Sequence, residues 1–138
     1  MTEKLGAYVP SRTPLGLPAA CTAFGVGLVF LVSGADKLLE HATAAAHFAS
    51  WAFPLPGVTV VVAGALELAG GLLLMGGLAV RGSALVLAVE MGVVWVLAGA
   101  HAGHEQLVVP LALALTCAAL AHAAARAERQ ASVDVGRL

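Results

Sequence analysis

Residues 57–79 read GVTVVVAGALELAGGLLLMGGLA and contain a single ionisable side chain, Glu67. A helix that crosses the hydrocarbon core of a bilayer needs about 20 apolar residues. Three further segments reach that length, at about residues 17–36, 82–100 and 107–125. Because lipid cannot satisfy unpaired backbone groups, such runs cross the membrane as helices. The sequence therefore predicts an all-α fold, an integral membrane four-helix transmembrane bundle.

The composition of the 138 residues excludes an ordinary water-soluble domain. Hydrophobic residues make up 60% of the chain and charged residues 11%, and the mean hydropathy is +0.94. Soluble domains carry about 25% charged residues, and so small a chain has too little interior to bury this much apolar surface. The net charge is -1 without a basic stripe, so nucleic acid is excluded as a partner. The predicted partner is the lipid bilayer.

The spans form one transmembrane domain over residues 17–125. A flexible tail is predicted at residues 1–16 and a second tail at residues 126–138. We expect a very tight turn at Arg81 between the second and third spans, and a turn over residues 101–106 before the fourth span.

Lysine and arginine residues orient the bundle. Only Lys37 lies opposite the other six cations, which are Lys4, Arg12, Arg81, Arg126, Arg129 and Arg137. Cytoplasmic segments carry the excess of positive residues. We therefore predict that both the N and C termini are cytoplasmic and that residues 38–56 lie outside.

The outer segment over residues 38–56 holds three aromatic residues, Phe48, Trp51 and Phe53. An amphipathic segment at the level of the lipid headgroups explains them best, because aromatic side chains collect at that interface. A lid over a cavity is the alternative.

Glu67 lies near the middle of its span, where an ionisable residue is costly and usually functional. Gly57, Gly64 and Gly71 recur every seven residues, and Glu67 follows Gly64 by three positions and precedes Gly71 by four. These residues share one helix face, and small residues mark faces where helices approach closely. We expect Gly64 and Gly71 to pack against other helices and Glu67 to point into the bundle.

Glu90 lies near the middle of the third span, at a depth similar to that of Glu67. Ser83 lies seven residues before Glu90 and His101 lies eleven residues after it. These spacings are close to two and three helical turns, so the three residues form one polar line on the same helix face. No lysine or arginine lies at the depth of the glutamates in the sequence. We therefore expect Glu67 to be protonated at neutral pH. Two roles stay open: a proton relay or contact to a quinone-type headgroup, and hydrogen-bonded packing between helices.

The first span carries a polar stripe of Thr22, Gly25, Ser33 and Asp36, and Lys37 follows directly after it. Ser33, Asp36 and Lys37 are either candidate functional residues or a polar helix end from which Lys37 reaches the outer interface. On the outer side, His101 and His104 have a helical spacing and are weak candidates for metal ligands. Metal sites ordinarily need three or four convergent ligands, so no metal site is predicted. The sequence shows no nucleophile motif or phosphate loop, and no catalytic residue is predicted.

Two stretches resemble the DoxX family. Residues 27–38, GLVFLVSGADKL, match its first-helix signature of glycine, phenylalanine, glycine and lysine-leucine, and residues 66–74, LELAGGLLL, followed by Gly77-Leu78 and Arg81, match its second helix. The resemblance covers roughly residues 20–100. Relatives often carry an arginine early in the first helix, where this chain has Cys21-Thr22. The positions that carry over are Gly34, Lys37, Glu67 and Gly71.

This resemblance implies a multi-pass protein of the bacterial cytoplasmic (inner) membrane. Relatives belong to redox systems, including the small subunit of a thiosulfate:quinone oxidoreductase and a membrane complex for thiol and superoxide stress. The leading hypothesis is an accessory subunit of such a system, with redox-complex protein partners or a homo-oligomer and with quinone as the cofactor it would contact. The alternative is a membrane scaffold, assembly chaperone or small lipid carrier, as for similar four-helix proteins of animals.

Cysteine labelling in intact cells tests the predicted orientation. With the native cysteines replaced by alanine, Glu40→Cys should react with an impermeant maleimide from outside, and Arg81→Cys should react only after the cells are opened. The positive-inside distribution is the physical reason. Labelling of Arg81→Cys in intact cells, with Glu40→Cys protected, would reverse the orientation.

Overall fold

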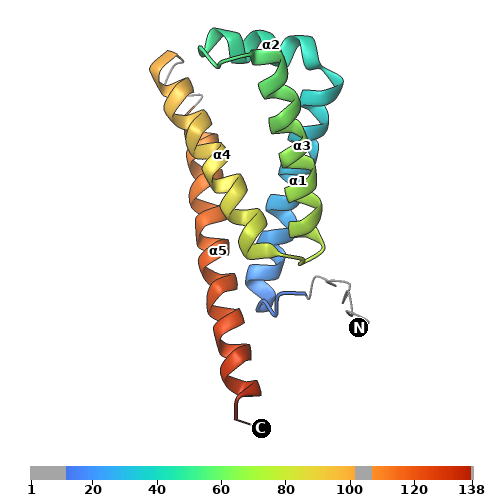
Figure 1. Ribbon diagram of the computed structural model, residues 1–138, viewed down its shortest axis with the longest axis vertical. Helices are drawn as coiled ribbons and strands as arrows, with labels where there is room; N and C mark the ends of the chain where they lie inside the picture. The colour runs from blue at the N-terminus through green and yellow to red at the C-terminus, as the bar shows by residue number, and fades with distance from the viewer. Residues whose placement is uncertain (1–11, 102–106, 138) are drawn as a thin grey trace, which may run out of the picture.

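The computed structural model describes residues 12–101 and 107–137 (Figure 1). These residues form α1 (Leu17–Leu39), α2 (His41–Ser50), α3 (Pro56–Met75), α4 (Val80–His101) and α5 (Val108–Val135). All of these helices except α2 are long and apolar enough to cross a membrane. The predicted all-α membrane fold with four spans is confirmed.

The helix boundaries differ from the sequence-based ones at two places. The turn between the second and third spans lies before Arg81, which belongs to the first turn of α4. The chain reverses there through Gly77, with φ of 66°, and Ala79, with φ of 45°; glycine adopts this left-handed conformation without strain. In addition, α5 continues through most of the predicted tail to Val135. Residues 102–106 of the next predicted turn lie outside the described residues.

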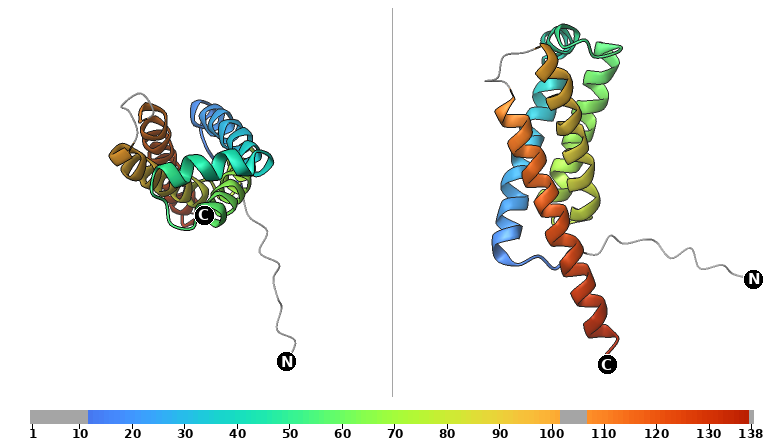
Figure 2. Two further views of the ribbon diagram at one scale, coloured as in Figure 1. Left: turned by 90° about the horizontal axis from the view of Figure 1, so that it is seen from above. Right: turned by 90° about the vertical axis from the view of Figure 1, so that its left-hand side faces the viewer.

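The four spans form two antiparallel pairs. α1 packs mainly on α3, and α4 mainly on α5. The two pairs meet at the end where α3 turns into α4 and diverge toward the opposite end, which α2 crosses (Figures 1 and 2). The result is a V-shaped bundle whose open end is bridged by α2.

Glycine residues bring the backbones of α1 and α3 together. A methyl group built on Gly71 would lie 2.6 Å from the carbonyl oxygen of Gly27, and one built on Gly34 would lie 2.6 Å from the carbonyl oxygen of Gly64. Side chains larger than hydrogen do not fit at such an approach. In an antiparallel pair, residues that lie opposite each other have residue numbers with a constant sum. That sum is 98 for both contacts, so the two contacts define a single register for α1 and α3.

The two pairs join through an apolar core near the tip of the V. Leu87 of α4 is fully buried and lies against Gly70 of α3. The surrounding cluster comprises Ala23, Phe30, Leu74, Val80, Ala84, Met91, Cys117, Leu120, Ala121 and Ala124. A smaller cluster of Phe48, Phe53, Val60 and Ala63 lies beneath α2. Packing is therefore dense at the tip and beneath α2.

Replacement of Gly71 by alanine tests the contact between α1 and α3. The new methyl group would meet backbone atoms, which cannot move as a side-chain end can, so we expect a loss of about 1–3 kcal/mol in stability. Gly92→Ala on α4 is the matched control, because nothing lies within 4 Å of its added methyl group. Thermal unfolding in detergent measures both. An unchanged melting temperature for Gly71→Ala would contradict the close approach.

Candidate functional site

A buried ion pair links α1 to α3. The ammonium group of Lys37 donates hydrogen bonds to Glu67 Oε1 at 3.0 Å, to Glu67 Oε2 at 2.8 Å and to Ser33 Oγ at 2.7 Å. The side chain of Glu67 is 1% exposed and that of Lys37 18%. The premise that Glu67 has no cation near it is therefore wrong, and the prediction that rested on this premise loses its support. The ammonium group of Lys37 points into the bundle, toward Ser33 and Glu67.

The antiparallel register explains why Lys37 and Glu67 meet although they lie at different positions along their spans. Residues of α1 and α3 whose numbers sum to 98 lie opposite each other, so Lys37 lies level with Val61, six residues or about 9 Å from Glu67 along the axis. Side chains on a helix lean toward its N-terminus. In an antiparallel pair, Lys37 therefore leans deeper into the bundle while Glu67 leans outward toward it. These two displacements close the gap.

Glu90 lies close to this pair, but it has no hydrogen-bonding partner in the part of the chain that the structure describes. Both of its carboxyl oxygens are buried, and neither has a hydrogen-bonding partner among the described residues. A buried polar atom without a partner costs about 1–3 kcal/mol. The structure thus gives the two glutamates different environments: Glu67 is paired, and Glu90 is not.

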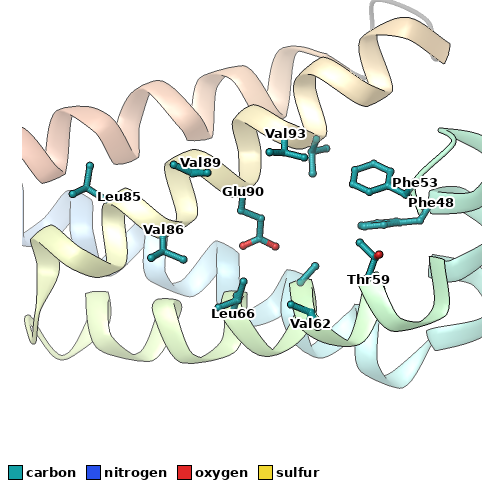
Figure 3. Close-up of a pocket in the computed structure, with 12 residues that line it drawn as sticks. Phe48, Phe53, Thr59, Val62, Leu66, Leu85, Val86, Val89, Glu90 and Val93 are labelled. Atoms are coloured by element: carbon teal, nitrogen blue, oxygen red, sulfur yellow. The ribbon is translucent and has the colours of Figure 1, made fainter. Parts of the chain in front are cut away.

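An apolar groove of about 440 Å³ lies between α3 and α4 and contains Glu90 (Figure 3). Glu90 reaches from α4 toward α3, and the rings of Phe48 and Phe53 stand at one end of the groove. The ring centroids of the two phenylalanines are 4.6 Å apart. The remaining walls are formed by Thr59, Val62, Ala63, Leu66, Leu85, Val86, Val89, Val93 and Val94. Glu90 is the single ionisable residue of the lining.

A second, inner cavity of about 160 Å³ lies deeper in the V. Ser33, Lys37, Glu67 and Glu90 supply its polar wall, and α5 closes it with Val109, Pro110 and Leu113. Phe48, Glu90 and Val94 belong to the linings of both the groove and this cavity. The inner cavity therefore adjoins the groove at Glu90.

The other sequence-predicted residues do not join this cluster. Asp36 is exposed on α1. His101 is exposed at the end of α4, with its Nδ1 3.0 Å from the Leu97 carbonyl oxygen. Ser83 is buried, but its hydroxyl has no partner among the described residues. The predicted polar line of Ser83, Glu90 and His101 is therefore not continuous. His104 lies outside the described residues.

The aromatic residues around α2 do not share one environment. Phe48 and Phe53 are buried and face the bundle, while Trp51 is half-buried. Phe48 and Phe53 form the end wall of the groove, as a lid over a cavity would, and the position of this segment at the level of the lipid headgroups stays a prediction. Sequence reasoning missed Gly27 as a packing residue. Its seven-residue spacing to Gly34 repeats that of Gly64 to Gly71, and this match is the signal that pairs the two helices.

The family profile named DoxX matches residues 24–100. The chain belongs to the DoxX family. The match contains the α1–α3 glycine contacts, the Lys37–Glu67 pair and Glu90, and it stops before α5. No curated protein and no solved structure matches the chain significantly. The family and the four apolar helices together identify a multi-pass membrane protein of the DoxX family.

Removal of one partner of the ion pair should destabilise the fold more than removal of both. Lys37→Met leaves the buried carboxylate of Glu67 without its cation, and we expect a loss of about 3 kcal/mol or more. The double variant Lys37→Met/Glu67→Leu replaces the pair by apolar side chains and should recover most of that loss. Unfolding of the three proteins in detergent measures the difference. A double variant that is no more stable than Lys37→Met would contradict the ion pair.

Proposed function

We propose that this DoxX-family protein is an accessory subunit of a redox or oxidative-stress system in the bacterial cytoplasmic membrane, and that it holds a quinone-type molecule in the groove between α3 and α4. The observation that carries the proposal is the position of Glu90: one carboxyl group with unpaired, buried oxygens inside an otherwise apolar groove. Such a groove fits an amphiphile with a small polar head and an apolar body.

The walls of the groove match the apolar body. Binding pockets for small molecules are mostly apolar, with a few polar groups that fix orientation. Val86, 48% exposed, and Val89, 67% exposed, are groove-lining residues on a membrane-spanning helix. A ligand can therefore enter the groove from the bilayer without crossing water.

The end of the groove matches a ring-shaped head. The rings of Phe48 and Phe53 offer an aromatic surface, against which a planar ring packs favourably. A carboxyl group donates a hydrogen bond when protonated and accepts one when ionised. Glu90 therefore has the means to bond to the carbonyl oxygen of a quinone or to the hydroxyl group of the corresponding quinol.

The redox part of the proposal rests on the DoxX family, whose resemblance implies association with quinone-linked and thiol-linked systems. A lipid carrier or scaffold is the competing function, since an apolar groove also accepts an acyl chain. The identity of the molecules that co-purify in mild detergent separates the two. A quinone supports the redox subunit, whereas phospholipid without quinone supports the carrier.

Quinone binding by groove variants tests the proposal directly. We expect a radiolabelled short-chain ubiquinone to bind the full-length protein in lipid nanodiscs, and Val86→Trp to raise the dissociation constant about tenfold or more, equivalent to about 1.4 kcal/mol, because the indole fills the groove. Val96→Trp is the matched control on the same helix: Val96 is 61% exposed and lies outside the groove lining.

Binding that is weakened by Val86→Trp and not by Val96→Trp supports a ligand in this groove. Equal binding by both variants and the wild type would place the quinone elsewhere. No saturable binding by the wild type would reject the proposed function.

A further inference from the structure

The groove and the inner cavity meet at one titratable side chain. Glu90 lines both spaces, together with Phe48 and Val94. Its carboxyl oxygens are buried and bonded to no described residue. Rotation about the side-chain bonds of Glu90 therefore turns the carboxyl group toward either space without breaking a hydrogen bond to the protein.

The groups that face Glu90 come from every surrounding helix. α1 contributes Lys37 and α3 contributes Glu67, while α2 and α5 contribute side chains that do not titrate, namely Phe48, Val109, Pro110 and Leu113. Asp36 and His41 lie near the same end of the bundle but are exposed. The charges of Lys37 and Glu67 offset each other in the ion pair. Loss of the proton from Glu90 therefore leaves the cluster of three side chains with a net negative charge.

We propose that Glu90 exchanges its proton with water at the α2 end of the bundle, through the inner cavity and by way of the Lys37–Glu67 pair. In this exchange the O–H bond of Glu90 breaks and an O–H bond forms on the Glu67 carboxylate. The proton then leaves Glu67 for water beside Lys37, and the ion pair is restored. No electrons move. The route would supply protons to, or remove them from, the polar head of a molecule bound in the groove. Only this use of the route rests on the proposed function.

The exposure of the cluster gives the direction of the route. Lys37 lies two residues from the end of α1, and its side chain is 18% exposed, whereas that of Glu67 is 1% exposed. Lys37 is therefore the more exposed member of the pair and lies nearer the α2 end of the bundle. A partly exposed lysine that pairs with a buried carboxylate is suited to stabilise the charge left when a proton departs.

Toward the tip of the V, α4 offers no titratable side chain close to Glu90 among the described residues. The next polar side chain of α4 toward the tip of the V is Ser83, seven residues or about 10 Å from Glu90 along the helix. Between α1 and α3, the backbones approach so closely that a methyl group on Gly71 would lie 2.6 Å from a carbonyl oxygen. Ser83 lines a separate cavity of about 300 Å³ near the tip and does not line the inner cavity.

Time-resolved infrared spectroscopy after a pH jump tests the route without any ligand. The full-length protein is reconstituted in lipid, and the carboxyl band of Glu90 is identified by its loss in Glu90→Gln. Leu113→Phe places a larger side chain in the inner cavity and should slow the response of that band about tenfold or more, as expected when a positioned proton-transfer group is cut off. Lys37→Met/Glu67→Leu should slow it in the same way.

Leu115→Phe is the matched control, because Leu115 is exposed on the same helix and lies outside the cavity lining. It should respond at the rate of the wild type. Wild-type rates in both Leu113→Phe and the double variant would overturn the route, as would equal slowing in Leu115→Phe. Because no quinone is present, this result is independent of whether the groove binds one.

Discussion

The close approach of α1 and α3 is the constraint on which the rest of the bundle depends. Four glycines let the two backbones touch, and the touching backbones fix a single register. That register brings Lys37 and Glu67 within hydrogen-bonding distance. A shift of one turn, about 5.4 Å, would leave a lysine and a glutamate unpaired inside the membrane, where each charge costs several kcal/mol. Glycine packing and the ion pair therefore specify the same arrangement.

The shape of the bundle follows from how unequally its helices are joined. α1 with α3 and α4 with α5 are extensive pairs, while the pairs meet mainly through Leu87, Gly70 and the apolar core at the tip. Two rigid pairs joined at one end diverge at the other. α2 bridges that open end, where Phe48 of α2 and Phe53 of the segment that follows it are buried. The groove and the inner cavity are consequences of this divergence, and Phe48 lines both of them.

The sequence predicted what depends on composition and period. Run lengths and hydropathy identified four spans, and the glycine spacing identified the face of α3 that carries Glu67. It did not predict what depends on how helices face each other. The pairing of Lys37 with Glu67 arises because two antiparallel side chains lean toward each other, a displacement that counting residues along each span omits. The inward orientation of Phe48 likewise depends on the V that α2 bridges, and aromatic content alone does not distinguish it from a headgroup anchor.

The two glutamates show how packing and function separate in this bundle. A glutamate that only packs helices should have its oxygens bonded to those helices, because unsatisfied buried polar atoms weaken a fold. Glu67 meets that requirement through Lys37, and its role in stability accounts for its presence. Glu90 bonds to no described residue, and a leucine would fill the same space between α3 and α4 at lower cost. Since the described residues give this carboxyl group no bonding partner, Glu90 is the side chain on which both the proposed ligand and the proposed proton route depend.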